Sequence, residues 1–305
     1  MNLPPEFALI ARHFRPLAGQ GGLDLSDDAA LLTLPPGREL VLAADAMVAG
    51  VHFLPSDPAE TIGRKLLRVN LSDLAAMGAD PLAYLLSDAL PRTTPDAWLA
   101  GFVAGLAQDQ AEFGLQVLGG DTVSTPGPVS LSLTILGTVA PGQALRRNGA
   151  RPGDALWVSG TIGDGALGLR AARGEIDNAY LADRYRLPQP RLALGRALRG
   201  LATACMDVSD GLVQDLGHLC RASGCGAVLE AARVPLSPAA HGAELGLLLT
   251  GGDDYELLFA LPPGVPAPDM AATRIGHFTY GAPDVLVLDE QGQPMALAAQ
   301  GWSHF

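Results

Sequence analysis

Aspartates recur in this sequence beside glycine or serine and at the ends of apolar runs. The segments are LSDDAALL, LAADAMVAGVHF, NLSDLAAMGADP, LGGDTV, MDVSDGL and GGDDYELLF, and they contain Asp27, Asp28, Asp45, Asp73, Asp121, Asp207, Asp210, Asp253 and Asp254. Carboxylates in such apolar surroundings are costly to bury unpaired. Mg²⁺ prefers oxygen ligands and is commonly held by a few carboxylates together with substrate phosphates. The pattern therefore predicts several magnesium ions that neutralise the triphosphate of ATP.

Single residues of this set also have plain structural interpretations. One aspartate alone is about as often a helix N-cap or a turn residue as a metal ligand. The whole set fits that interpretation less well, because N-caps need neither glycine pairs nor apolar strands around them. His52 follows Asp45 by seven residues and is interpreted as a substrate contact. Arg146 and Arg147 are either forked donors to phosphate or solvated loop residues.

Motifs of several other enzyme classes are absent from the sequence. No GxxxxGK[ST] occurs, and the single lysine, Lys65, follows no glycine-rich loop, which excludes a Walker-type NTPase. The protein-kinase motifs, GxSxG and HExxH are missing, and no Cys/His group has zinc spacing. The segment GTIGDG at 160–165 resembles a degraded dinucleotide fingerprint, and a strand-to-helix turn is the preferred interpretation.

Composition narrows the class of protein further. The chain has 305 residues, 48% apolar and 17% charged, which suits two compact domains. Its net charge of −12 and lack of a basic stripe predict no nucleic-acid partner. Three cysteines without a paired spacing indicate a reducing compartment. No run reaches the ~18 apolar residues of a membrane span, so we expect a cytoplasmic protein with no membrane partner.

Strand and helix patterns are mixed in both halves of the chain. Strands are predicted at 39–45, 115–118, 129–139, 155–159 and 203–206, and helices from Asp57, from 94 to Gly114, and at 164–173, 190–201 and 210–223. This mixture predicts an α+β or α/β protein. The turn-rich stretch at 141–153 sets the expected boundary near 147, which gives domains 1–147 and 148–305.

Nine segments together resemble the thiamine-monophosphate kinase family, part of the aminoimidazole ribonucleotide synthetase-like superfamily. They are SDDAALL, AADAMVAGVHFLP, VNLSDLAAMGADP, LGGDT, LRRNGARPGD, YRLPQPR, MDVSDGLVQDLGHL, GGDDYELLF and GWSHF, from residue 26 to the last residue and in family order. The resemblance implies a two-domain α+β fold with a ferredoxin-like N-terminal half, which forms a barrel with its twin in a homodimer, and an α/β C-terminal half. ATP would bind between the halves, and its γ-phosphoryl group would pass directly and in line to thiamine monophosphate.

The resemblance also implies roles for individual residues. Magnesium ligands would be Asp28, Asp45, Asp73, Asp121, Asp207 and Asp210. ATP contacts would be Gly120, Asp121, Arg147 and Ser209, and thiamine-phosphate contacts would be His52, Asp253 and Trp302. No general base is implied, because an acceptor that is already a phosphate dianion needs little proton abstraction.

The sequence departs from the family pattern at three places. Ala43 and Ala44 stand where the family has hydroxyl residues before Asp45, Asp253 replaces a glutamate, and Ser26 replaces a glycine. Two other functions therefore stay open: a synthetase-like enzyme of the same superfamily, and a non-catalytic protein that binds nucleotide or thiamine phosphate. Selenophosphate synthetase is disfavoured because no cysteine precedes Cys205.

Overall fold

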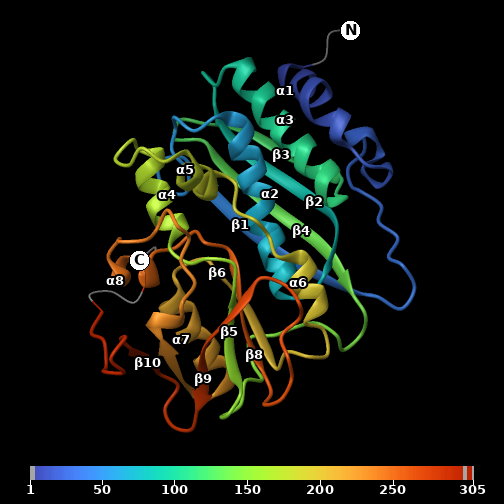
Figure 1. The fold of residues 1–305 in the computed structure, drawn as a ribbon. Helices are drawn as coiled ribbons and strands as arrows, with labels where there is room; N and C mark the ends of the chain where they lie inside the picture. The colour runs from blue at the N-terminus through green and yellow to red at the C-terminus, as the bar shows by residue number, and fades with distance from the viewer. Residues whose placement is uncertain (1–3, 298–300, 304–305) are drawn as a thin grey trace. The chain divides into compact units, whose positions relative to one another are not determined.

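The computed structural model of the chain describes residues 4–297 and 301–303. These residues form two units (Figure 1). Unit one contains the described residues up to Leu74 together with Asp80–Pro141, and unit two contains Ala75–Ala79 and the described residues from Gly142 onward. No helix in the described ranges combines the length and the apolar character needed to cross a membrane.

Unit one is built on a four-stranded sheet in the order β1-β4-β2-β3. Its strands are β1 (Glu39–Val48), β2 (Asp80–Pro91), β3 (Val117–Thr125) and β4 (Ser130–Val139), and its helices are α1 (Pro5–Leu9), α2 (Ala59–Ala76) and α3 (Asp96–Phe113), with a π-helix at Ile10–Phe14 and 3₁₀ turns at Arg15–Leu17 and Gln20–Leu25. The pairs β1–β4 and β4–β2 are antiparallel, and β2–β3 is parallel.

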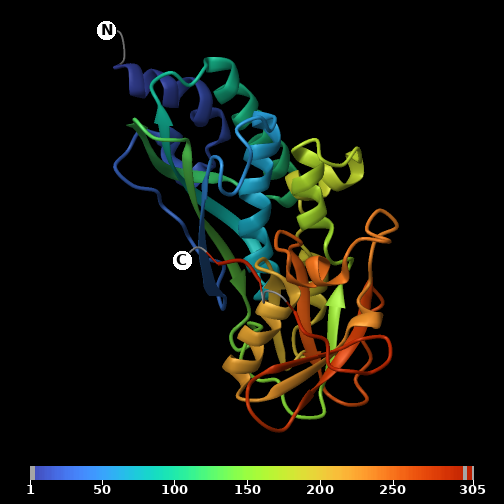
Figure 2. The same cartoon turned by 90° about the vertical axis from the view of Figure 1, so that its left-hand side faces the viewer.

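One face of this sheet is covered by helices, as Figures 1 and 2 show for α2 and α3. Buried and exposed residues alternate along β1, because successive side chains point to opposite faces. Val41 and Met47 are buried on the helical face, whereas Leu42 on the other face is 59% exposed. The sheet therefore positions polar residues on two distinct surfaces.

Unit two contains a six-stranded sheet in the order β10-β7-β9-β5-β8-β6. The strands are β5 (Ala155–Ser159), β6 (Ala204–Val208), β7 (Gly226–Glu230), β8 (Glu256–Leu261), β9 (Ala272–Thr279) and β10 (Val285–Leu288), and the helices are α4 (Asp164–Ala172), α5 (Ala179–Arg186), α6 (Leu192–Ala197), α7 (Leu212–Ser223) and α8 (Leu245–Thr250), with a 3₁₀ turn at Ala231–Arg233. All strand pairs are antiparallel except β10–β7. Every residue of β6 and β8 is buried, and α7 packs its apolar side into the same core.

Several predicted elements are confirmed, and several need correction. Strand β5 has the predicted bounds, and α3 ends at Gly114, whose φ of 70° makes it a left-handed C-cap. The first strand does not end at Asp45 but continues to Val48, because its backbone pairs with β4 throughout. The helix predicted at 190–201 is only Leu192–Ala197. Strands β2, β7, β8, β9 and β10 and helices α1, α5 and α8 were not predicted.

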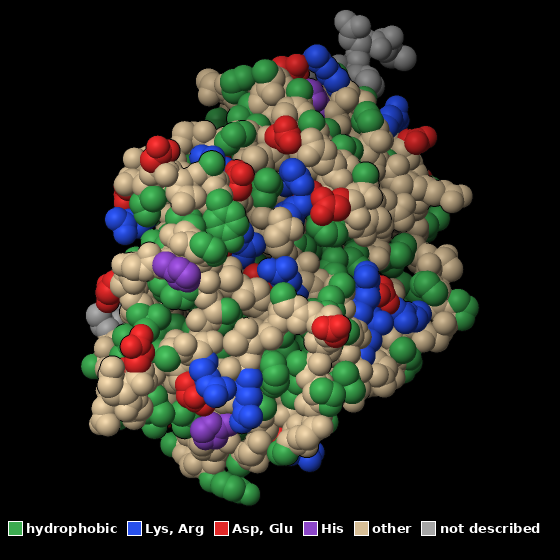
Figure 3. Space-filling model, in the orientation of Figure 1, with side chains coloured by type: hydrophobic (Ala, Val, Ile, Leu, Met, Phe, Trp, Pro, Cys, Tyr) green, Lys and Arg blue, Asp and Glu red, His purple; other side chains and the backbone are tan. Residues whose placement is uncertain are grey.

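The surface shown in Figure 3 carries basic side chains in separate small groups, many with an acidic side chain next to them. Exposed apolar residues lie between these groups on the same face. Charge is thus distributed locally on this face rather than gathered in one continuous band.

Candidate active site

A cavity of about 650 Å³ lies in unit one between the segment 10–32 and the sheet. Apolar side chains form much of its wall. Among the described residues, its polar lining includes the carboxylates of Asp27, Asp28, Asp88 and Asp121 and no Lys, Arg or His. Gly120 lines it as well, so three of the predicted site residues border one acidic cavity.

Gly120 and Asp121 owe their positions to the parallel pairing of β3 with β2. The register sets Gly120 opposite Leu86 and Asp121 opposite Ser87. A Cβ atom at position 120 would lie 1.6 Å from the carbonyl oxygen of Leu86, so this backbone requires glycine. Asp121 is exposed on the face that the helices leave open.

Asp88 is a carboxylate of this cavity that the sequence reasoning missed. It lies on β2 opposite Thr122, whose hydroxyl donates to Asp88 Oδ2 at 3.2 Å. Asp88 Oδ1 is buried and has no hydrogen-bond partner among the described residues. Burial raises the pKa of Asp88 to about 7, and the nearby charge of Asp121 also raises it, against the Thr122 hydrogen bond.

Asp45 and Asp73 belong to a second group in unit one, where α2 runs back along β1. The N–H of Asp45 donates to Asn70 Oδ1 at 3.2 Å, and Asp73 follows Asn70 by about one helical turn. His52 lies just beyond β1, where its Nδ1 accepts a backbone N–H at 3.0 Å. Its carbonyl oxygen accepts a hydrogen bond from Lys65 Nζ, also at 3.0 Å. The structure therefore brings the predicted ligand Asp45 and the predicted substrate contact His52 to the same strand–helix layer.

The two groups of unit one are separate. Asp45 lies on edge strand β1 and Asp121 on edge strand β3, with β4 and β2 between them. Three strand spacings of roughly 4.8 Å amount to about 14 Å, and the two side chains point to opposite faces. A magnesium ion lies about 2.1 Å from its ligands. One ion therefore cannot contact both residues within a single copy of unit one.

In unit two, Asp207 lies near the end of β6, and Ser209 and Asp210 lie in the turn that leads to α7. Asp215 from the first turn of α7 accepts the N–H groups of Ser209 and Asp210 through Oδ2, each at 3.0 Å. These bonds fix the backbone of the turn. Burial raises the pKa of Asp215 to about 7, and the charge of nearby Asp207 raises it too. The carboxylates of Asp207 on β6, Asp210 in the turn and Asp215 on α7 thus lie close enough to interact.

Asp210, Asp215 and His218 each bring one potential ligand atom to within 4.8 Å of the other two. Asp215 and His218 are three residues apart on α7, so they lie on the same side of the helix. Burial lowers the pKa of His218, the charges of Arg221 and Arg147 lower it further, and Asp210 opposes them. The predicted ATP contact Arg147 is therefore close enough to this group to act on it electrostatically.

The loop 251–255 is strained and is fastened to the same turn. Asp253 and Tyr255 have φ values of 70° and 52°, in a region that costs a non-glycine residue of the order of 1 kcal/mol. The N–H of Asp253 donates to the carbonyl of Ser209 at 2.9 Å, and the N–H of Tyr255 donates to that of Val208 at 2.7 Å. Two predicted contacts, Asp253 for substrate and Ser209 for ATP, are thereby hydrogen-bonded neighbours.

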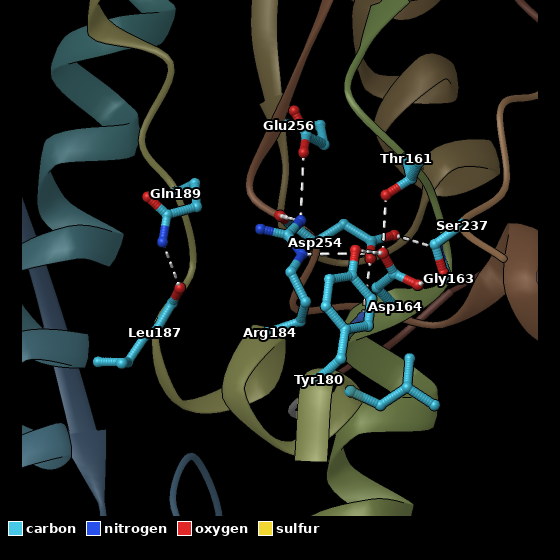
Figure 4. Close-up of polar contacts among 12 residues, drawn as sticks. Thr161, Gly163, Asp164, Tyr180, Arg184, Leu187, Gln189, Ser237, Asp254 and Glu256 are labelled. Atoms are coloured by element: carbon cyan, nitrogen blue, oxygen red, sulfur yellow. Dashed lines mark hydrogen bonds and ion pairs between the residues drawn. The ribbon is translucent and has the colours of Figure 1, made fainter. Parts of the chain in front are cut away.

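A buried polar network supports this loop (Figure 4). Asp254 accepts the N–H groups of Gly163 at 2.7 Å and Gly165 at 2.9 Å, at the start of α4. Burial raises the pKa of Asp254, whereas these bonds and the Arg184 guanidinium lower it. Asp164 in the same helix accepts hydroxyl hydrogen bonds from Thr161 at 2.7 Å, Tyr180 at 3.0 Å and Ser237 at 2.6 Å.

Two arginines complete the network around the buried Glu256. Arg184 Nη2 donates to Glu256 Oε1 at 3.2 Å, and its Nε lies 3.7 Å from Asp164 Oδ2. Arg191 Nε donates to Glu256 Oε2 at 2.6 Å. Ser159 also donates to Glu256, at 2.5 Å. The segments YRLPQPR and GGDDYELLF are therefore linked directly, by Arg191 and Glu256.

The described C-terminal residues 301–303 lie on the β6–α7 turn as well. The N–H of Trp302 donates to the carbonyl of Asp210 at 2.9 Å. The Trp302 side chain is 52% exposed. Its indole therefore remains accessible to a ligand beside a predicted metal ligand.

Comparison with known proteins gives the family. The model for the AIR synthase related protein, N-terminal domain, matches residues 26–139, and the model for the C-terminal domain matches residues 151–269. The thiamine-monophosphate kinase of Caulobacter vibrioides is 44% identical over 326 residues, which cover 99% of this chain and 91% of that protein. The crystal structure of thiamine-monophosphate kinase from Stenotrophomonas maltophilia K279a is 39% identical with a TM-score of 0.84, and covers 95% of this chain and 98% of that one.

This chain belongs to the thiamine-monophosphate kinase family.

A further structure agrees with this assignment. AaThiL complexed with AMPPCP and TMP is 31% identical to this member of the thiamine-monophosphate kinase family, with a TM-score of 0.81. The match covers 100% of this chain and 99% of that one. The family resemblance and the α+β, AIR synthase-like fold expected from the sequence are both confirmed.

The donor chemistry of this thiamine-monophosphate kinase family member suits a hard divalent cation. The cavity of unit one has four carboxylates and, in the described part of the chain, no basic residue in its lining. One of the four, Asp88, has a buried Oδ1 to which no described group donates a hydrogen bond. Oxygen-only donors and excess negative charge fit Mg²⁺ better than a soft transition metal.

Sequence reasoning missed the residues that support the site in this kinase family member. Asn70, Asp215 and His218 had a detectable signal, because each stands three residues before or after another polar residue on a predicted helix. No local sequence signal marked Arg184, Arg191 and Glu256, because their hydrogen bonds join positions 65 or more residues apart.

Proposed function

We propose that this protein transfers the γ-phosphoryl group of ATP to thiamine monophosphate, giving thiamine diphosphate and ADP. The observation that carries the proposal is family membership over nearly the entire chain, together with the AaThiL complex that holds AMPPCP and TMP in the same fold. A phosphate oxygen of thiamine monophosphate forms the new bond to the γ-phosphorus, and the bond from that phosphorus to the β–γ bridging oxygen breaks, which releases ADP. The acceptor oxygen is already ionised near neutral pH, so no general base is required.

We assign the metal sites to the two groups in unit one and to the β6–α7 turn. Asp28 and Asp121 border the acidic cavity, Asp45 lies on β1 and Asp73 on α2, and Asp207 lies near the end of β6 with Asp210 in the turn that follows. Magnesium, when bound, screens the charge of the phosphates and stabilises the charge that develops during transfer.

The replacement of family hydroxyls by Ala43 and Ala44 leaves a backbone donor in place. The N–H of Asp45 points away from β4, since it donates to Asn70. In an antiparallel pair, the N–H and the C=O of one residue point to the same side of the strand, and those of the residue two positions away do so too. The carbonyl of Ala43 therefore also points away from β4. We propose that this carbonyl replaces the missing hydroxyl as an oxygen ligand.

The remaining predicted residues bind and orient the two substrates. Arg147 and Ser209 contact ATP, as does the backbone at Gly120. His52, Asp253 and Trp302 contact thiamine monophosphate, with the half-exposed indole packing on its heterocycle. The strained loop 251–255 sets the direction of Asp253 before substrate arrives, which lowers the entropic cost of orientation.

We further propose that the protein acts as a homodimer in the cytoplasm, where ATP is supplied. The open face of the unit-one sheet exposes Leu40, Leu42, Leu85 and Val123. A second copy packed on this face would cover the apolar side chains.

The dimer proposal is tested by sedimentation of Leu42→Asp and Leu85→Asp variants. We expect both to shift the protein to monomer at micromolar concentration, because each buries a charge in the interface. Leu201→Asp, which changes an exposed apolar residue of unit two, is the control. Dimers that persist in both variants contradict the assignment of this face.

The reaction itself is tested with purified protein, ATP and magnesium, with and without thiamine monophosphate. We expect ADP and thiamine diphosphate in equal amounts, and only when thiamine monophosphate is present. ADP formation only with aminoimidazole-pathway substrates identifies the synthetase-like alternative. Binding of both ligands without turnover identifies the non-catalytic alternative.

A further inference from the structure

The first turn of α7 holds two functional segments at once. Asp215 in this turn accepts the N–H groups of Ser209 and Asp210. Its neighbour Gln214 points to the C-terminal segment instead, where its Nε2 donates to the carbonyl oxygen of Trp302 at 2.6 Å. Consecutive residues of one helix therefore fix the metal-binding turn and the backbone of Trp302.

The C-terminal segment is held on both sides of the Trp302 peptide. The N–H of Trp302 donates to the carbonyl of Asp210 at 2.9 Å, and its carbonyl accepts from Gln214. Gly301 approaches the same surface so closely that a Cβ there would lie 2.5 Å from Gln214 Cβ and 2.7 Å from the carbonyl oxygen of Asp210. Glycine at 301 thus permits a contact that a larger residue would prevent.

The main chain of Trp302 is fixed, whereas its ring is 52% exposed. A ring carried on a fixed backbone has fewer orientations to lose when a ligand packs on it, so less binding free energy is lost to ordering. The Gln214 hydrogen bond is one of the contacts that hold this backbone in place.

We infer that Gln214 is a positioning residue that holds Trp302 in the orientation that receives thiamine monophosphate, a role that rests on the substrate contact proposed above. It does not touch the reacting atoms and acts through the backbone of Trp302. Its removal weakens substrate binding without changing phosphoryl transfer, and the effect depends on the indole.

Steady-state kinetics of the full-length chain test this role in Gln214→Ala and Gln214→Glu. We expect the KM for thiamine monophosphate to rise about 5- to 10-fold in Gln214→Ala, the equivalent of one hydrogen bond, with kcat and the KM for ATP within about twofold. Gln214→Glu keeps the shape and places an acceptor against the Trp302 carbonyl, so its KM rises at least as much. Gln291→Ala, an exposed glutamine elsewhere, is the matched control and is unchanged.

A double-mutant cycle separates positioning from a general structural effect. In a Trp302→Ala background, the ring that Gln214 positions is gone, so adding Gln214→Ala leaves the KM for thiamine monophosphate unchanged. An increase of equal size in both backgrounds, or no increase in either, overturns the inference.

A measurement without substrate distinguishes this inference from the proposed function. The chain has three tryptophans, so Trp98→Phe and Trp157→Phe together leave Trp302 as the sole fluorophore of this type. We expect acrylamide to quench Trp302 more strongly when Gln214 is alanine, because the segment is freed from α7. Equal quenching overturns the role of Gln214, whereas unequal quenching with no turnover of thiamine monophosphate supports it and overturns only the proposed reaction.

Discussion

The cavity of unit one and the buried polar network of unit two use carboxylates in opposite ways. Asp28 and Asp121 in unit one are exposed beside a cavity, whereas Asp164, Asp254 and Glu256 in unit two are buried and each accept two or more hydrogen bonds. An exposed carboxylate can exchange water for a cation at low cost, but a buried one is committed to its protein donors. Within these two sets, burial and hydrogen bonding, rather than residue type, distinguish the carboxylates that can bind a cation from those that support the fold.

The largest effect on activity is expected at Asp73, a proposed metal ligand on α2. Asp73→Asn removes a charged oxygen ligand, and we expect kcat/KM to fall at least about 100-fold, equal to roughly 3 kcal/mol of lost transition-state stabilisation. The magnesium activation curve shifts to higher concentration, while the melting temperature stays within a few degrees. Asp269→Asn, at an exposed position of unit two, is the control. Unchanged kinetics would remove Asp73 from the metal site.

A second comparison uses adjacent residues, Asp27 and Asp28. Asp27 Oδ1 already accepts the N–H of Asp28, a bond that an asparagine can still accept. We therefore expect Asp28→Asn to lower kcat/KM by roughly tenfold or more and Asp27→Asn to change it by less than about threefold. The measurement is kcat/KM at saturating ATP and several magnesium concentrations. The reverse order of effects would assign the ligand to Asp27.

The adjacent residues Asp253 and Asp254 test the distinction between substrate binding and structural support within unit two. Asp254→Asn leaves one of the two N–H groups from α4 without an acceptor, and we expect a loss of about 2 kcal/mol in the free energy of unfolding. Asp253→Asn should raise the KM for thiamine monophosphate with little change in stability. Thermal denaturation and kinetics on both variants test the pair. Equal destabilisation by both substitutions would contradict the separation of support from binding.

Asp88 is a buried acid that lines a cavity, and the effect of replacing it depends on pH. Its pKa is about 7 in the folded protein against an ordinary 3.8, so the folded state binds the proton more tightly. Wild-type stability should therefore fall as the pH rises from about 4 to about 7. Asp88→Asn removes this fall, and its stability relative to wild type should grow over that interval by at most about 4 kcal/mol, since each pKa unit corresponds to about 1.4 kcal/mol. Denaturation in a chelator at pH 5 and pH 8 measures the difference, and parallel pH profiles would contradict it.

The sequence revealed elements whose signals are local. Gly114 ended α3 as predicted because glycine adopts the left-handed cap without strain, and β5 was bounded by turn residues on both sides. Strand β2 was missed because its polar Ser87 and Asp88 interrupt the apolar pattern. Strand β8, buried along its whole length, showed no alternation to detect.

The site residues likewise divide into those with a local sequence signal and those placed by contacts between distant segments. Asp28 and Asp121 stand in short motifs, and the structure places both at one cavity. Asp45 and Asp121 both follow apolar runs in the sequence, but the strand order places them on opposite edges of the sheet. Spacing along the chain carries no information about strand order. The partners of Glu256, at positions 184 and 191, could not be found for the same reason.

The single lysine of the chain, Lys65, is 2% exposed and donates to the carbonyl of His52. An amine-reactive label can reach its Nζ only when the layer between β1 and α2 opens. The rate at which Lys65 is labelled therefore reports how often this region opens beside Asp45 and His52. If ATP and magnesium bind there, they should lower the labelling rate of Lys65, and no engineered probe is needed to measure it.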